Sequence, residues 1–208
     1  MKLERPTHVR KSNRSSGWLS EFTEEIPGQI AAGINRLGDG EYTIYSIYPL
    51  PPDAAYDETI YPDEWVQTTG IAPDRLTVEI RRLDSDGFYR VYTIGHPTTE
   101  TDSEATEPIR NGDNSYLVRP AEVLSATEAI DLFQHFYDHH GVPSGWELRE
   151  QPEFTMAADA SATAATKPGA GISRDTPASS PATTTSRTAP KKEPAHDKLE
   201  SRRQTRSS

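Results

Sequence analysis

Aromatic residues confine the folded part of this chain to its middle. All seventeen Phe, Tyr and Trp residues lie between Trp18 and Phe154 of the 208 residues. Large, rigid apolar side chains supply much of the burial that offsets the entropy of ordering a chain, so segments that lack them do not fold alone. The sequence therefore predicts one domain, residues 18–155, which is long enough to bury a core. A flexible basic arm, residues 1–17, precedes it.

Residues 156–208 form a tail that we expect to be disordered. Of these 53 residues, sixteen are Ser or Thr, eleven are Ala and five are Pro. Such a composition is typical of linkers and disordered segments, because it offers almost no apolar surface to bury.

Charge divides along the same boundaries. Residues 18–155 hold eight Arg, no Lys and 26 Asp or Glu, a net charge of −18, whereas both flanking segments are mildly basic. This field repels nucleic acid and attracts cationic partners, so we expect no direct nucleic-acid binding by the domain. Selection for solubility, or a halophilic or GC-rich source, is an alternative origin of the same composition.

Several classes of protein are disfavoured by what the sequence lacks. It contains no Cys, which excludes disulfides, thiolate metal sites and cysteine nucleophiles. The absence of Cys fits a reducing compartment or a lineage that uses little cysteine. We see no secretory signal and no apolar run long enough to cross a bilayer. The expectation is therefore a cytoplasmic protein without membrane contact.

Two amphipathic helices are predicted. In the first, residues 23–37, apolar side chains recur at helical spacing, with Thr23 as the expected N-cap and Gly38-Asp39-Gly40 as the stop. The second opens with the capping-box pattern Ser125-Ala126-Thr127-Glu128 and runs to about His140, where Gly141 is the expected C-terminal glycine.

The remaining elements are predicted to be strands, at 41–48, 75–83, 88–94, 115–119 and 146–150. In 75–83, Leu76, Val78 and Ile80 alternate with polar residues, which predicts one buried and one wet face. Asp84-Ser85-Asp86-Gly87 is the expected hairpin loop. Residues 63–66 are predicted to be a short helical turn and 97–113 an acidic loop. We therefore predict an α+β fold with an antiparallel sheet of about 4–5 strands packed by the two helices.

Histidines are the main candidates for catalysis or metal binding. Asp131, His135 and His139 are spaced i, i+4, i+8, which can present three ligands on one helix face. Histidines near a helix C-terminus also favour the helix dipole, and no Glu completes an HExxH motif. His96 ends a strand without a nucleophile elbow. We therefore predict no enzymatic activity, no metal and no cofactor; a histidine-dependent enzyme is the alternative and would place a histidine in a pocket.

The end of the domain has a recognisable order. A strand at 116–119 leads through Pro120 and Val123 into a helix that carries Phe133 and Phe136. A Gly-Val-Pro turn at 141–143 then leads to a Trp-containing strand. This order resembles the C-terminal signature of immunity protein family number one of bacterial polymorphic toxin systems, over roughly residues 20–150. The Pro- and Asp-rich loop at 49–62, the basic arm and the tail depart from that pattern.

The resemblance implies a non-enzymatic antidote that binds a cognate toxin domain, often a nuclease or deaminase. Toxins that act on nucleic acid tend to be basic, and a domain of net charge −18 would attract such a partner quickly. The candidate toxin-binding residues are the carboxylates of the hairpin and of the acidic loop: Asp84, Asp86, Glu100, Asp102 and Glu104. The alternative, which the composition favours slightly for any one residue, is that both segments are ordinary solvated loops. A DNA mimic or accessory protein that sequesters a basic host protein is the alternative binder.

Overall fold

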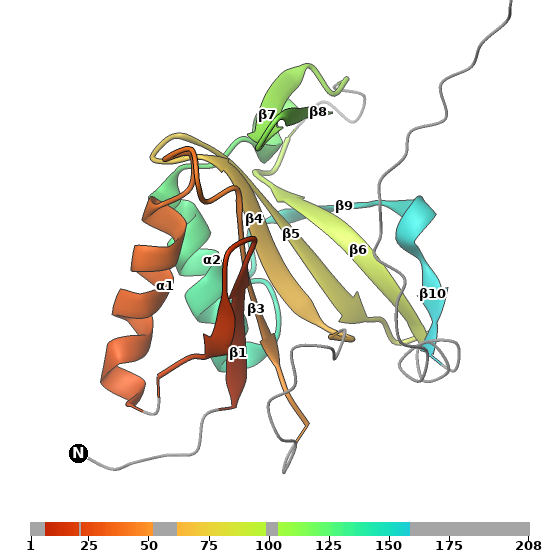
Figure 1. The fold of residues 1–208 in the computed structure, drawn as a ribbon. Helices are drawn as coiled ribbons and strands as arrows, with labels where there is room; N and C mark the ends of the chain where they lie inside the picture. The colour runs from red at the N-terminus through yellow and green to blue at the C-terminus, as the bar shows by residue number, and fades with distance from the viewer. Residues whose placement is uncertain (1–6, 21, 52–61, 99–103, 159–208) are drawn as a thin grey trace, which may run out of the picture. The chain divides into compact units, whose positions relative to one another are not determined.

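The computed structural model describes residues 7–20, 22–51, 62–98 and 104–158. The chain divides into two units, Met1–Ala170 and Gly171–Ser208, and every described residue belongs to the first. That unit has the predicted α+β fold, in which two helices pack on an antiparallel sheet (Figure 1). The predicted start of the disordered tail is wrong at its first two residues, because Met156–Ala157 form strand β10 of the sheet. From residue 159 on, the predicted tail lies outside the described residues.

In the described part of the chain the main sheet has eight strands, more than the 4–5 predicted. Their order is β10-β6-β5-β4-β3-β1-β2, and all pairs are antiparallel. Strand β9 also pairs with β6, so that β9 and β10 follow one another along the same edge of β6. The strands are β1 His8–Ser12, β2 Ser16–Trp18, β3 Ile44–Pro49, β4 Trp65–Ile71, β5 Arg75–Leu83, β6 Phe88–Gly95, β9 Glu147–Glu150 and β10 Met156–Ala157.

The helices cover one face of this sheet. They are α1, Ile26–Asn35, preceded by the 3-10 turn η1 at Thr23–Glu25, and α2, Ala126–His139, preceded by η2 at Pro120–Glu122. Leu76, Val78 and Ile80 of β5 are fully buried beneath them, as their alternation predicts. The capping box is confirmed, because Glu128 Oε2 accepts the backbone N–H of Ser125 at 2.8 Å while Ser125 Oγ accepts that of Glu128 at 3.3 Å.

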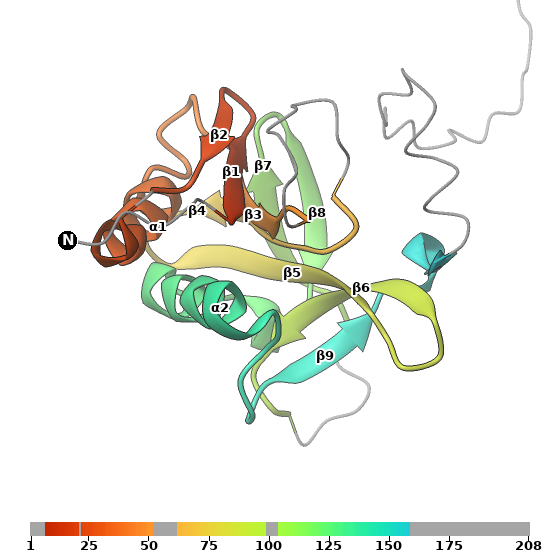
Figure 2. The same cartoon turned by 90° about the horizontal axis from the view of Figure 1, so that it is seen from below.

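The prediction that the other face of β5 is wet is wrong. Thr77, Glu79 and Arg81 are only 1%, 8% and 5% exposed. A separate two-stranded ribbon, β7 Glu107–Asn111 and β8 Asn114–Val118, packs across β4 and β5 on that side (Figure 2). The buried carboxylate of Glu79 has hydrogen-bond partners, since it accepts from Gln67 at 3.2 Å and from Gln151 at 2.8 Å.

Three other segments differ from their predicted structure. Within the predicted flexible arm, 1–17, His8–Ser12 forms β1, which pairs with β3 and buries Val9 completely. The predicted helical turn at 63–66 runs instead into β4, whose Thr and Val side chains suit the centre of a sheet. The predicted acidic loop, 97–113, contains β7, because pairing with β8 satisfies its backbone.

The helix ends also differ in detail. Thr23 is not the N-cap of α1; Glu25 takes that position, without a side-chain hydrogen bond, and Pro27 fits in the first turn. At the end of α2, the left-handed residue is His140, with φ 53°, rather than Gly141. The stripe predicted for α1 is confirmed at Ile26, Ile30 and Ile34, all buried. Among the described residues, no helix combines the length and apolar character needed to cross a membrane.

Candidate functional site

The predicted contact residues Asp84 and Asp86 lie together in the loop between β5 and β6, but their charges are not free. Arg90 bonds Asp84 at 2.9 Å and Asp86 at 2.6 Å, and Arg82 Nε lies 3.1 Å from Asp84. Partial burial alone would raise the pKa of Asp84, yet hydrogen bonds from Tyr92 and Arg90 outweigh it and lower that pKa. The hydrogen bond from Arg90 likewise lowers the pKa of Asp86. Both carboxylates therefore stay ionised and hold the hairpin in shape.

The structure does not bring the other predicted contact residues to this hairpin. Glu100 and Asp102 lie outside the described residues. Glu104 is exposed and precedes β7, whose Glu107 pairs at 2.9 Å with Arg75 at the start of β5. The hairpin is at the far end of the same nine-residue strand, which at ~3.3 Å per residue is about 26 Å away. The role of these five residues in toxin binding stays a prediction.

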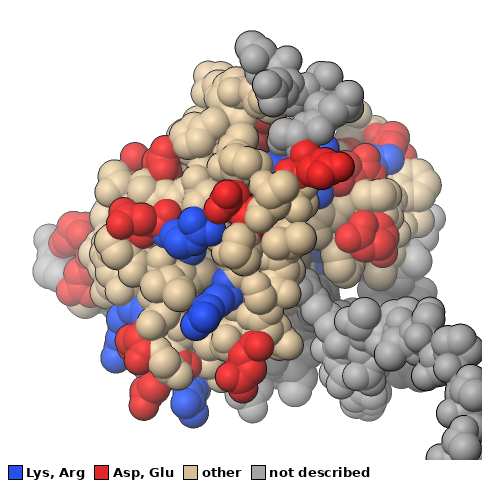
Figure 3. Space-filling view, turned by 90° about the horizontal axis from the view of Figure 1, so that it is seen from above, with Lys and Arg blue, Asp and Glu red and all other residues tan. Residues whose placement is uncertain are grey.

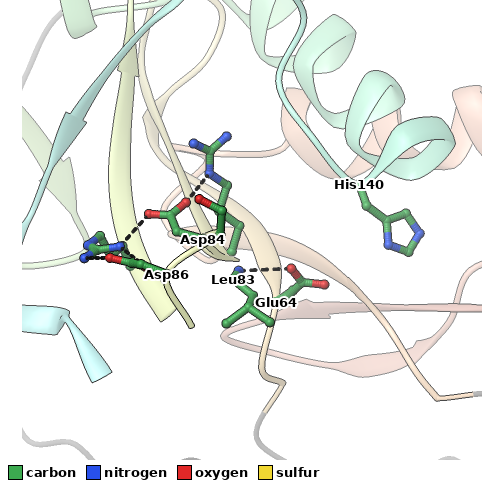
Figure 4. A pocket seen from close by; sticks show the side chains of 8 residues that line it. Glu64, Leu83, Asp84, Asp86 and His140 are labelled. Carbon is green, nitrogen blue, oxygen red and sulfur yellow. Dashed lines mark hydrogen bonds and ion pairs between the residues drawn. The ribbon is translucent and has the colours of Figure 1, made fainter. Parts of the chain in front are cut away.

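A cleft of about 670 Å³ opens between the hairpin and the end of α2. Figure 4 shows Asp84 and Asp86 with their arginine partners, Glu64 beside Leu83, and His140 on the opposite side, next to α2. Glu64 Oε1 accepts the backbone N–H of Leu83 at 3.1 Å. The cleft is therefore lined by three carboxylates and by their partners Arg82 and Arg90, and the carboxylate lone pairs that these arginines leave unused can accept hydrogen bonds from a cationic side chain.

Next to the cleft, exposed apolar side chains gather on the sheet face opposite the helices. This hairpin surface consists of Trp65, Leu83, Tyr89 and Met156. The strand register places Leu83 opposite Tyr89, and Tyr89 opposite Met156. Leu83 is 44% and Met156 39% exposed, while Trp65 and Tyr89 are half-buried. No sequence signal reveals this surface, because its members come from four different strands.

Charged groups surround the hairpin surface. The guanidinium of Arg81, the cross-strand neighbour of Trp65, lies 4.9 Å from the centre of the Tyr89 ring. Burial and the nearby carboxylates of Asp63 and Glu64 raise the pKa of Tyr89. An apolar and aromatic centre with a polar rim is typical of protein–protein interfaces.

The histidines considered for catalysis occupy two different environments. His135 and His139 lie next to each other on the outer part of α2, with ring centroids 4.5 Å apart and ring planes tilted by 52°. No three His, Asp or Glu side chains in the described part of the chain are arranged to hold a metal ion. His96 instead lines a small cavity at the other end of β6.

Comparison of the chain with protein-family models, with curated proteins and with solved structures finds no match in any of the three. The site must therefore be interpreted from its own geometry.

Proposed function

We propose that this domain is an immunity-type protein that binds and neutralises a basic toxin domain, a nuclease or deaminase, in the cytoplasm. Under this proposal the toxin docks on the hairpin surface and inserts a cationic side chain into the adjoining cleft. The observation that carries the proposal is the exposure of Leu83 and Met156 beside the half-buried Trp65 and Tyr89, within reach of several carboxylates.

The composition of the hairpin surface supports a protein partner. Tyr, Trp and Arg supply most binding hot spots, and aromatic and Met side chains are enriched in interface centres. Arg81 is only 5% exposed and holds Tyr89 in place by a cation–π contact. The surface is therefore partly ordered before binding, which reduces the entropy lost on association.

The charge of the domain supports a basic partner. Residues 18–155 carry a net charge of −18, and carboxylates outnumber Arg and Lys on the face that Figure 3 shows. Such a field raises the association rate with a cationic protein, especially at low salt. The resemblance to the immunity family points the same way.

The DNA-mimic alternative makes a different demand on the carboxylates. A mimic presents its acidic groups free, spaced like phosphates, whereas Asp84 and Asp86 are paired with Arg90. A defined apolar docking surface therefore fits the described hairpin better than imitation of a phosphate backbone.

The test uses the full chain and the toxin domain encoded beside its gene. Both Leu83 and Leu117 are exposed, at 44% and 57%, but Leu117 lies on β8, away from the hairpin. We expect Leu83→Ala to weaken binding at least tenfold and Leu117→Ala to change it less than twofold. The association rate should fall as salt rises.

Two results would contradict the proposal: a toxin whose activity the full chain leaves unchanged, or equal losses of affinity in the two leucine variants. Retention of a basic DNA-binding host protein in place of a toxin would support the mimic.

A further inference from the structure

A second cavity lies at the end of β6 that is remote from the hairpin. Its volume is about 290 Å³, and its lining comes from β6, the segment after it, η2 and the start of β9: Thr93, Gly95, His96, Thr98, Arg119, Ala121, Glu122, Glu147, Leu148 and Arg149. Gly95 and Phe88 stand at opposite ends of the eight-residue strand β6, about 23 Å apart at ~3.3 Å per residue. The cavity is therefore separate from the proposed toxin site.

The cavity is lined by two arginines and two glutamates, but only Arg149 and Glu122 pair with each other. Glu122, 3% exposed, is held by two nitrogens of Arg149, one of them at 2.9 Å, and by the backbone N–H of Arg119 at 2.9 Å. Glu122 and Arg149 thus neutralise each other. The guanidinium of Arg119 has no hydrogen-bond or ion-pair partner among the described residues, although the residue is half-buried. A partly desolvated cation without a counter-charge favours an anionic ligand.

Two acidic groups near the cavity do not pair with Arg119. Glu147 also lines the cavity, but it is exposed and forms no ion pair with Arg119 in the described part of the chain. Glu128 is directed to His96, whose Nε2 lies 3.0 Å from Glu128 Oε1. The same carboxylate is anchored by Ser125 through the capping box.

His96 is positioned to supply a second contact. Its ring stacks on Trp146, with centroids 4.8 Å apart and planes 29° from parallel. Because Glu128 takes up Nε2, the other ring nitrogen, Nδ1, is left for a ligand. Histidine can donate hydrogen bonds from both ring nitrogens in its imidazolium form.

We propose that this cavity binds a small oxyanion, a carboxylate or phosphate group, between the guanidinium of Arg119 and the ring of His96. The planar fork of Arg matches two oxygens of either group. The ligand must be small, since the volume is at the lower limit for ligand pockets. Gly95 allows β6 and η2 to approach closely at the cavity, because a Cβ at this position would lie 3.0 Å from the Ala121 carbonyl oxygen and 3.1 Å from Glu122 Cγ.

The experiment is an NMR titration of the full chain that follows the indole N–H of Trp146 and the ring nitrogens of His96. Potassium phosphate and potassium acetate are added in separate series at constant ionic strength, balanced with chloride. We expect saturable shifts with at least one probe, and the stronger of the two identifies the preferred oxyanion. Arg119→Gln should weaken that binding at least tenfold.

The matched control is Arg110→Gln, which makes the same charge change at an exposed arginine of β7 without a partner among the described residues. It should leave the affinity within twofold of the parent. His96→Gln provides an independent loss of one contact and tests the site if Arg119→Gln does not fold. Shifts that fail to saturate with both probes, or an unchanged affinity in both site variants, would overturn the assignment.

Discussion

Among the ion pairs of the described residues, Arg149 is the partner of the most deeply buried carboxylate. Replacing Arg149 with Met removes the positive charge that balances this carboxylate. The side chain of Glu122 is 4% exposed and that of Arg149 32%. Arg149 also donates to Thr93 Oγ1 at 3.1 Å. Met keeps much of the aliphatic volume of Arg, so the substitution changes the charge more than the packing.

The expected cost follows from that burial. Breaking a buried ion pair by removing one partner typically costs ~3–5 kcal/mol, because the remaining charge is left uncompensated. Since about a third of the Arg149 side chain already reaches water, we expect the low end, about 3 kcal/mol. For a domain of this size, this corresponds to a fall in Tm of roughly 6–12 °C.

Urea unfolding followed by tryptophan fluorescence measures the effect, with Arg110→Met as the control at an exposed arginine. The control should change the free energy of unfolding by less than ~0.5 kcal/mol. Adding Glu122→Gln to Arg149→Met should recover most of the loss, because the buried charge disappears while an oxygen remains to accept the N–H of Arg119. If Arg149→Met is as stable as the control, Glu122 does not depend on Arg149 and the charge balance inferred for the cavity is wrong.

Three further changes in stability are expected. Burial and the nearby charge of His140 lower the pKa of His8 from 6.5 to about 4. As pH drops from 6.5 to 4, His8 is protonated in the unfolded chain but not in the folded one. The free energy of unfolding therefore falls by up to about 3 kcal/mol over this range. Urea midpoints should show this loss in the parent and a smaller one in His8→Leu. Gly70→Ala should destabilise the domain severely in thermal melts, because φ is 128° and the new Cβ would collide with the carbonyl of Arg75; a Tm near that of the parent would contradict it. Ser125→Ala should cost about 1 kcal/mol through loss of the α2 N-cap, and an equal loss in Thr127→Ala would argue against a capping effect.

The fold was predictable where a signal is local. The stripe at Ile26, Ile30 and Ile34, the capping box at Ser125 and the hairpin around Asp84 each depend on residues a few positions apart. Strand β5 was predicted with its observed bounds, because its period of two is contained in nine residues. By contrast, the sequence did not predict that β4 pairs with the other edge of β5, because β4 carries Thr, Gln and Gly rather than a run of apolar residues.

The candidate sites were much less predictable. Asp84 and Asp86 were identified as a pair, but nothing in the sequence indicates that Arg90 holds both of them. Likewise, His96 was a candidate because it ends a strand, while its neighbours Trp146 and Glu128 come from other parts of the chain.

By itself, the sequence determined the excess of negative charge in the central segment, its two helices and its α+β class, because composition and periodicity act through neighbouring residues. Only the tertiary structure decided how its surfaces are built. Burial of Glu79 requires Gln151, 72 positions away, and the hairpin surface requires Met156 to pair with Tyr89. Such contacts form only when the whole sheet is assembled, and no local pattern specifies which distant segments meet.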